Sequence, residues 1–107
     1  MNNDKVLSSL CLARKAGKLC TGTEQCLDAV RGKKALLTLI ACDVSANTLK
    51  LITDKSSSYG VPVEKTAYSR EQLGAAFGSP ECACAAICDM NFVKMYASAK
   101  NKQAEVN

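Results

Sequence analysis

Residues 36–41 read LLTLIA, a nearly continuous apolar run close to the middle of the 107-residue chain. A strand with one face in solvent alternates apolar and polar residues, whereas a strand covered on both faces is apolar throughout. The run therefore predicts a central strand with helices packed on both sides of its sheet.

Helical and extended patterns alternate on either side of this strand. Helices are expected over residues 3–16, from Ser45 to Tyr59 and from Asp89 onward. Two more are expected to begin at capping boxes: one at the Thr-x-x-Glu box of residues 21–24, ending at Gly32, and one at the Ser-x-x-Gln box of residues 69–72, ending at Gly78. Shorter strands are expected at 18–20, 61–65 and 82–88. The polar residues 100–107 are expected to fray. This order predicts one domain over residues 1–107, a three-layer α/β/α sandwich around a four-stranded sheet that is largely parallel or mixed.

The composition describes a globular protein with an aliphatic core, because 48% of the residues are hydrophobic and Trp is absent. Apolar runs reach only about a third of the roughly 20 residues that cross a bilayer, and the first residues lack the pattern of a secretory signal. The seven cysteines are odd in number and lie mostly in apolar runs, as free thiols do in a reducing compartment. We expect a cytoplasmic location and no membrane partner.

The net charge of +4 is concentrated in the first third of the chain. Residues 1–34 contain seven basic and three acidic side chains, whereas the remaining 73 residues contain seven of each. The elements built from the first third should therefore present an electropositive face. A pair such as Lys33 and Lys34 is equally typical of a solvated turn, and cations at a helix end also interact favourably with its dipole.

The chain lacks an obvious catalytic or metal-binding pattern. It contains no His, and therefore no ready general base near neutral pH, and neither a P-loop nor a dinucleotide-binding glycine motif. Cys82, Cys84 and Cys88 would share one face of a strand, but without a paired C-x-x-C spacing we interpret them as core residues. The same interpretation covers Cys11, Cys20, Cys26 and Cys42. We expect no enzyme activity, metal, cofactor or small-molecule substrate, with a thiol-based metal or redox protein as an open alternative.

Six short motifs follow one another along almost the whole chain. They are LARKAGKL at 12–19, GTEQ at 22–25, ACDVSANT at 41–48, ITDK at 52–55, YGVPV at 59–63 and LGAAFG at 73–78. In this order and spacing the sequence resembles the ribosomal protein L7Ae family, which has bacterial, YlxQ-type members. The resemblance implies an α/β/α fold that binds structured RNA, namely kink-turns in ribosomal or regulatory RNA, with the ribosome as a further candidate partner.

The resemblance also implies which residues contact RNA. Members of the family use the turn into their second helix to contact sheared G·A pairs, and an apolar loop before their last strand to contact an extruded base. The first surface corresponds to Gly22, Thr23, Glu24, Gln25 and Asp28. The second surface corresponds to residues 78–82, with Pro80, Glu81 and Cys82. Phosphate contacts would come from Lys18, Arg31, Lys33 and Lys34.

Glu24 and Asp28 depart from the family pattern, which usually has Asn or Lys at the first position and Lys at the second. Carboxylates repel phosphates, so we expect a reduced affinity for a standard kink-turn or a changed RNA preference. Two alternatives therefore stay open. The segment 21–24 is also a well-capped helix start with no further role, and the protein is also compatible with a protein-interaction module, associated with the ribosome or RNA metabolism, that has weakened RNA binding.

Overall fold

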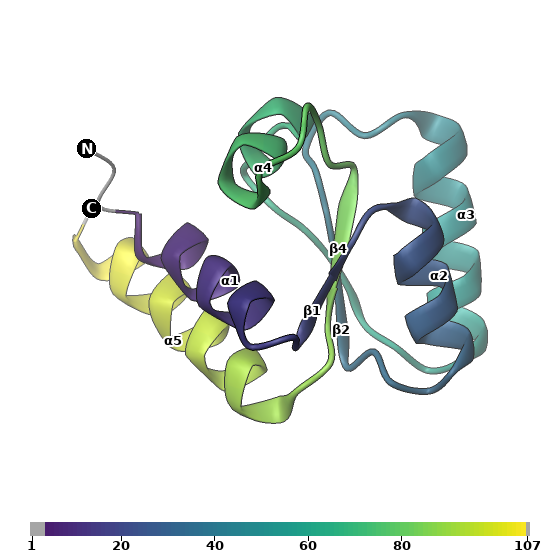
Figure 1. Cartoon of the computed structure of the whole chain (residues 1–107), viewed down its shortest axis with the longest axis horizontal. Coiled ribbons are helices and arrows are strands. Elements are labelled where there is room, and N and C mark those ends of the chain that lie inside the picture. Colours follow the sequence, from purple (N-terminus) through teal and green to yellow (C-terminus); the bar gives the residue numbers. More distant parts are fainter. Residues whose placement is uncertain (1–3, 107) are drawn as a thin grey trace.

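The computed structural model describes residues 4–106, in which five helices and four strands follow the predicted order (Figure 1). The elements are α1 (Lys5–Lys15), β1 (Leu19–Thr21), α2 (Thr23–Arg31), β2 (Leu37–Ile40), α3 (Ala46–Ser58), β3 (Val63–Lys65), α4 (Arg70–Phe77), β4 (Cys84–Ile87) and α5 (Met90–Val106). Helices α2 and α3 cover one face of the sheet, and α1 and α5 cover the other (Figure 1). The predicted α/β/α sandwich is confirmed. Within residues 4–106, no helix combines the length and hydropathy that crossing a bilayer requires.

The sheet is mixed, with the strand order β1-β4-β2-β3. Strands β2 and β3 are parallel, whereas β4 lies antiparallel to both β2 and β1. Of the two predicted alternatives the mixed sheet is therefore correct, and parallel pairing is limited to one pair. The cause is the position of α4, which lies at one end of the sheet rather than across its face (Figure 1). The chain consequently re-enters the sheet from that end as β4.

The prediction of a strand covered on both faces is confirmed for β2, since all four of its residues are buried. Successive residues of the strand enter two different cores. Leu39 packs with Leu73 of α4 in the core that also involves α1 and α5, while Ile40 packs with Ile52 in the core beneath α2 and α3. All four residues of β4 are buried as well. The two central strands therefore contribute side chains to both cores.

Three helices begin with the predicted caps. Ser45 accepts a hydrogen bond from the Thr48 backbone at the start of α3. Ser69 and Gln72 form the reciprocal capping box of α4. Asp89 accepts a hydrogen bond from the Asn91 backbone at 2.8 Å at the start of α5.

The predicted capping box at 21–24 is wrong. Thr21 pairs with Ala85 as the last residue of β1, and Gly22 separates it from the first residue of α2, so Thr21 lies one position before the N-cap. Helix α2 begins two residues later, with Gly22 as its N-cap and with no side-chain hydrogen bond at that cap. The start of α2 is therefore formed by backbone alone.

Three smaller expectations also need correction. Cys82 and Cys84 lie in different cores, because the regular strand begins only at Cys84 and its alternation does not extend back to Cys82. Cys42 is exposed just after β2 rather than buried. The segment 100–107, which we expected to fray, continues α5 as far as Val106, and Asn107 lies outside the described residues.

Gly74 allows α4 to pack closely against the loop that leads into β4. A Cβ atom at this position would lie 2.6 Å from the Glu81 Cα and 2.7 Å from the Ser79 backbone oxygen. The Ser79 backbone N–H also donates to the Gly74 carbonyl at 2.8 Å. Both close neighbours are backbone atoms, which cannot rotate away as the end of a flexible side chain could.

We predict that Gly74→Ala lowers the free energy of unfolding by about 1–3 kcal/mol, the usual cost of overpacking. The sign of this change in stability is informative, because Gly→Ala inside an unhindered helix is stabilising by about 0.5–1 kcal/mol. Urea unfolding followed by circular dichroism measures the change. Ala75→Ser, at an exposed neighbouring position on α4, is the control and should shift the stability by less than about 0.5 kcal/mol. A Gly74→Ala protein as stable as the parent would refute the close contact.

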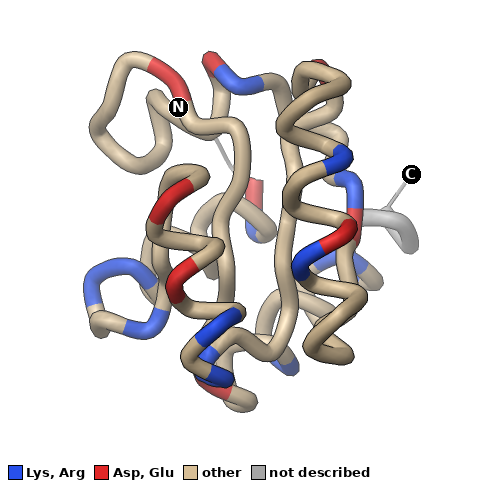
Figure 2. Tube along the Cα trace, turned by 90° about the vertical axis from the view of Figure 1, so that its right-hand side faces the viewer, with Lys and Arg blue, Asp and Glu red and all other residues tan. Residues whose placement is uncertain are grey.

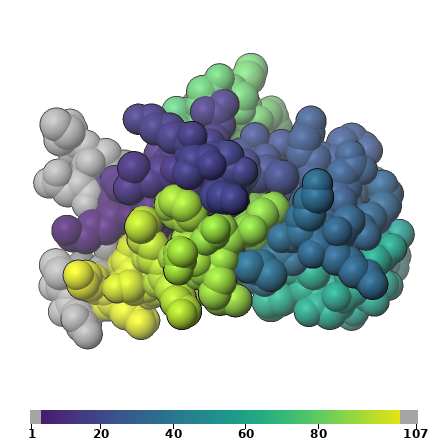
Figure 3. All heavy atoms as spheres, turned by 60° about the horizontal axis from the view of Figure 1, so that its bottom comes forward, coloured from purple at the N-terminus to yellow at the C-terminus, as the bar shows by residue number. Residues whose placement is uncertain are grey.

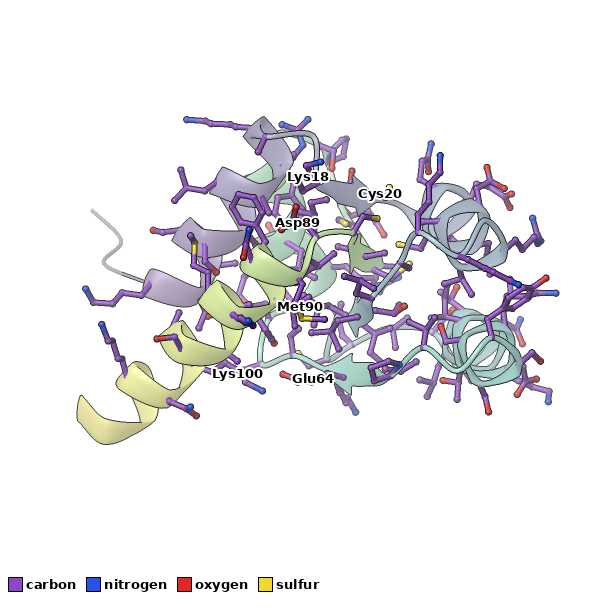
Figure 4. All side chains as sticks on the ribbon, turned by 90° about the horizontal axis from the view of Figure 1, so that it is seen from below. Lys18, Cys20, Glu64, Asp89, Met90 and Lys100 are labelled. Atoms are coloured by element: carbon purple, nitrogen blue, oxygen red, sulfur yellow. The ribbon has the colours of Figure 1, made fainter. Side chains whose placement is uncertain are left out.

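Glu64 ties the edge strand β3 to α5. Its Oε2 atom accepts hydrogen bonds from the Tyr96 hydroxyl and from Lys100 Nζ, each at 2.6 Å, and Glu64 and Lys100 lie close together in Figure 4. Burial alone would raise the pKa of Glu64, but the hydrogen bonds from Lys100 and Tyr96 outweigh it and hold this pKa below 4.5. The ionised carboxylate therefore stabilises the fold.

We predict that Glu64→Gln lowers the free energy of unfolding at neutral pH and that this loss shrinks in acid. The folded pKa lies below the unfolded one, so the stabilisation is complete above the unfolded value of 4.5 and disappears as pH falls through the folded pKa. Urea unfolding of both proteins between neutral pH and about pH 3 measures the difference. A stability gap that stays constant over this range would contradict the role of the charged carboxylate.

Candidate RNA interface

Gly22 opens α2 in a backbone conformation that belongs almost only to glycine. Its φ is 98° and its ψ is 154°, a region that side chains with a Cβ avoid. The Gly22 N–H donates to the Cys84 carbonyl at 3.0 Å and its carbonyl accepts from the Cys26 N–H at 3.0 Å. The glycine thus joins the end of β1 to the start of both β4 and α2.

Gln25 folds its side chain over this glycine. A Cβ atom on Gly22 would lie 2.8 Å from Gln25 Oε1, so the glycine leaves the space that the Gln25 amide occupies. Gln25 and Glu24 are exposed and Thr23 is half-buried. A helix start without a side-chain cap presents backbone N–H groups and a positive dipole end. These groups, together with a side-chain amide that both donates and accepts, suit the oxygen-rich surface of a nucleic acid.

The loop over residues 78–82 leads into β4 beside this helix start, because the Gly22 N–H donates to the Cys84 carbonyl and the Gly22 backbone also hydrogen-bonds Cys82. Gly78 ends α4 with φ 77° in the left-handed region, and Pro80 and Glu81 are exposed. Cys82 is different, because its side chain is only 4% exposed and its thiol donates to the Cys84 carbonyl at 3.1 Å. The two surfaces that the sequence predicted separately are therefore one corner, which we call the α2 corner (residues 22–25 and 78–82), and Cys82 lines its buried side.

Sequence reasoning missed two residues that hold the loop of this corner. Arg70 at the start of α4 lies between two carboxylates, with its Nε 3.5 Å from Asp43 and its Nη1 3.6 Å from Glu81. The Cys82 N–H donates to the Arg70 carbonyl at 3.0 Å, and the Arg70 N–H donates to Asp43 at 2.8 Å. Asp43 and Arg70 are 27 residues apart, so no local pattern could have paired them.

The predicted phosphate contacts lie elsewhere. Lys18, Arg31, Lys33 and Lys34 are all exposed and gather at the C-terminal end of α2, which we call the basic end. Figure 3 shows the ends of α1 and α2 and the start of α5 on one continuous face of the molecule. Because α2 has nine residues and rises by about 1.5 Å per residue, the basic end lies about 13 Å from the α2 corner. The structure thus divides the predicted site into two parts.

The charge on the exposed face of α2 changes from negative to positive along the helix. Glu24 and Asp28 lie on its first two turns, and the basic residues follow (Figure 2). Asp28 is paired with Arg31 at 3.3 Å, but both side chains are largely in solvent, so this ion pair adds little to stability. Along α2, the basic residues of the expected electropositive face therefore lie at the basic end, and the α2 corner carries the Glu24 carboxylate.

The thiols near the α2 corner contact other groups of the protein. Burial raises the pKa of Cys82, opposed by a hydrogen bond from the Gly22 backbone. Cys26 and Cys84 form a buried pair. Their mutual hydrogen bond raises the pKa of Cys26, which keeps its proton, and lowers the pKa of Cys84, which Thr23 also contacts. Over residues 4–106, no three cysteine, aspartate or glutamate side chains are arranged to hold a metal ion.

Two grooves on the surface follow α1. One groove, of about 680 Å³, separates α1 from α4, and another, of about 560 Å³, separates α1 from α5. Both are lined by Leu12, whose side chain is 52% exposed. They lie in the layer opposite α2 (Figure 1), so neither groove forms part of the α2 corner.

Two named bacterial proteins have similar sequences. RNA-binding protein YlxQ of Enterococcus faecium is 38% identical over 79 residues, which cover 74% of this chain and 76% of that protein. RNA-binding protein YlxQ of Bacillus subtilis (strain 168) is 35% identical over 87 residues, which cover 81% of this chain and 86% of that protein. The similarity thus extends over most of each protein.

Two solved structures share the fold. A protein with unknown function from Bacillus halodurans C superposes with a TM-score of 0.81 at 34% identity, covering 91% of this chain and 97% of that one. The Giardia lamblia 15.5kD RNA binding protein superposes with a TM-score of 0.69 at 21% identity, covering 92% and 83%. The family model of the Ribosomal protein L7Ae/L30e/S12e/Gadd45 family matches residues 4–97. With this match and two relatives above 30% identity, the chain belongs to that family and is similar to its bacterial YlxQ-type members.

Proposed function

We propose that this protein binds structured RNA of the kink-turn type, without a catalytic step, through the α2 corner and the basic end. The names of the two bacterial relatives support RNA as the ligand. The observation that carries the proposal is the start of α2, where Gly22 adopts a glycine-only conformation and brings backbone N–H groups and the Gln25 amide to an open surface.

Each part of the surface has a chemical role in the proposal. The Gln25 amide hydrogen-bonds the edge of a purine in a groove that non-Watson–Crick pairs have widened. The first N–H groups of α2 bind a backbone oxygen. Pro80 at the tip of the 78–82 loop supplies an apolar contact for an unstacked base. Lys18 and Lys34 at the basic end neutralise phosphates of a flanking stem, which positions the RNA without reading its sequence.

We predict that Gln25→Ala and Lys18→Glu weaken RNA binding in different ways. Gln25→Ala removes a specific hydrogen bond and should lower the affinity for a kink-turn by roughly tenfold, with little effect on a straight duplex. Lys18→Glu should weaken binding to both RNAs and reduce the slope of log affinity against log salt by about one. Gel-shift titrations of the full chain at several salt concentrations measure both effects.

Lys50→Ala serves as the matched control, because Lys50 is an exposed lysine of α3 outside both parts of the surface. It should leave both affinities unchanged. If the parent protein binds a kink-turn and a straight duplex equally weakly, specific recognition of the bend is excluded.

We also predict that removing the carboxylates from α2 strengthens binding. Glu24→Asn and Asp28→Lys eliminate repulsion with phosphates, and each should raise the affinity for a kink-turn on the order of tenfold. Asp28→Lys additionally frees Arg31 from its ion pair at 3.3 Å. Asp54→Lys is the control, since Asp54 forms a similar exposed ion pair with Lys50 on α3. An equal gain in affinity from Asp54→Lys would show that only net charge matters.

The acidic first turns of α2 favour one second candidate, a protein-interaction module with weakened RNA binding that is associated with the ribosome or RNA metabolism. Glu24 and Asp28 make this face less suited to phosphates than the basic end. Affinity purification with and without ribonuclease distinguishes the two candidates. Partners that are lost after ribonuclease treatment support RNA binding, and partners that survive it support the module.

A further inference from the structure

Cys20 and Cys88 lie in contact at the exposed edge of the sheet. Their Sγ atoms are 3.9 Å apart, and both side chains are half-buried. Cys20 pairs with Ala86 across the β1–β4 ladder, and Cys88 is two residues further along, so both side chains point to the same face of the sheet. The backbone fixes this proximity, because the Cys88 N–H donates to the Lys18 carbonyl at 2.8 Å.

We propose that Cys20 and Cys88 form a redox-active dithiol, a modification site that is oxidised reversibly to a disulfide by a peroxide. Disulfide formation requires the sulfur atoms to move about 2 Å closer. Strand β1 has three residues and pairs only with β4, so this edge of the sheet can adjust more easily than its centre. The inference does not depend on RNA binding.

The surroundings distinguish this pair from the other cysteines. Cys26 and Cys84 also form a thiol pair, but each is 0% exposed, so an oxidant cannot reach them in the folded protein. Cys42 is exposed but lies beyond the opposite end of β2. Cys11 donates its thiol to the Ala76 carbonyl in the other helical layer. Among the described cysteines, Cys20 and Cys88 thus combine a close partner with access from solvent.

The two sulfur atoms have different roles in the reaction. Burial and the neighbouring Cys20 raise the pKa of Cys88 to about 11, although Lys34 and Lys18 oppose this shift. Cys88 therefore keeps its proton. We assign the first attack to Cys20, which lies on the outer strand β1. Figure 4 shows Lys18 and Cys20 at the same end of the sheet.

The reaction balances with hydrogen peroxide as the oxidant. The Cys20 thiol loses its proton as its sulfur attacks one peroxide oxygen, the O–O bond breaks, and the departing hydroxide takes up that proton to become water. The sulfur of Cys88 then attacks the Cys20 sulfenic acid, the S–O bond breaks, and the leaving hydroxide takes the Cys88 proton as a second water. Two thiols lose two electrons in total, and the peroxide is reduced to two waters.

The test is peptide mapping of the full chain after mild peroxide treatment and alkylation of the remaining thiols, without reductant. We expect one intramolecular Cys20–Cys88 linkage, a mass lower by two hydrogen atoms, and full reversal by dithiothreitol. A Cys42→Ser background prevents intermolecular bridges through the exposed thiol. The linkage should be absent from Cys20→Ser and Cys88→Ser proteins, and mapping of the parent chain decides the question even if a serine variant does not fold.

A second probe tests proximity without oxidation. Phenylarsine oxide condenses with two adjacent thiols to form two As–S bonds and one water, so a single adduct should form on the parent chain and should be lost from either serine variant. Peroxide treatment that leaves Cys20 and Cys88 fully alkylatable, or that oxidises Cys20 only to the sulfinic acid, would overturn the proposal. Failure to form the arsenical adduct would overturn it as well.

Discussion

The structure depends on the way β4 hydrogen-bonds to two strands at once. Its residues pair with β2 on one side and with β1 on the other, and the ladder continues past its ends, since Ala41 donates to Ala83 and Leu36 donates to Ile87. At one end of β4, the Gly22 N–H reaches Cys84 and creates the α2 corner. At the other end, the Cys88 N–H donates to the Lys18 carbonyl, which places Lys18 at the basic end. One strand therefore positions both parts of the surface.

The sequence predicted the layers well because their signals are local. The apolar run of β2, the box from Ser69 to Gln72 and the left-handed Gly78 each act within a few residues. Thr21 was misread because its spacing to Glu24 satisfies the same rule, while the pairing with Ala85 that keeps it extended is a contact over more than 60 residues. The direction of β4 was left open for the same reason, since the placement of α4 sets it.

The resemblance to a known family selected candidate site residues, but not their arrangement in space. The resemblance to a known family pointed to Gly22, Gln25 and the 78–82 loop, and the structure brings these together in one corner. Composition pointed to a basic first third, but α2 itself contains two acidic residues and only one basic residue, Arg31, which lies at the end remote from that corner. The Arg70 contacts to Asp43 and Glu81 were beyond prediction, because two loops have to meet the start of α4 before the charges can pair.

The two outer strands of the sheet are short, and this has a consequence for the behaviour of the protein in concentrated solution. Unpaired backbone groups along a sheet edge are templates on which other chains can add strands and start aggregates. Here β1 and β3 each have only three residues, Pro62 precedes β3, and Glu64 and Lys65 place charges on it. Neither edge offers a long, flat, neutral template, so the sheet is protected against polymerising with its own copies.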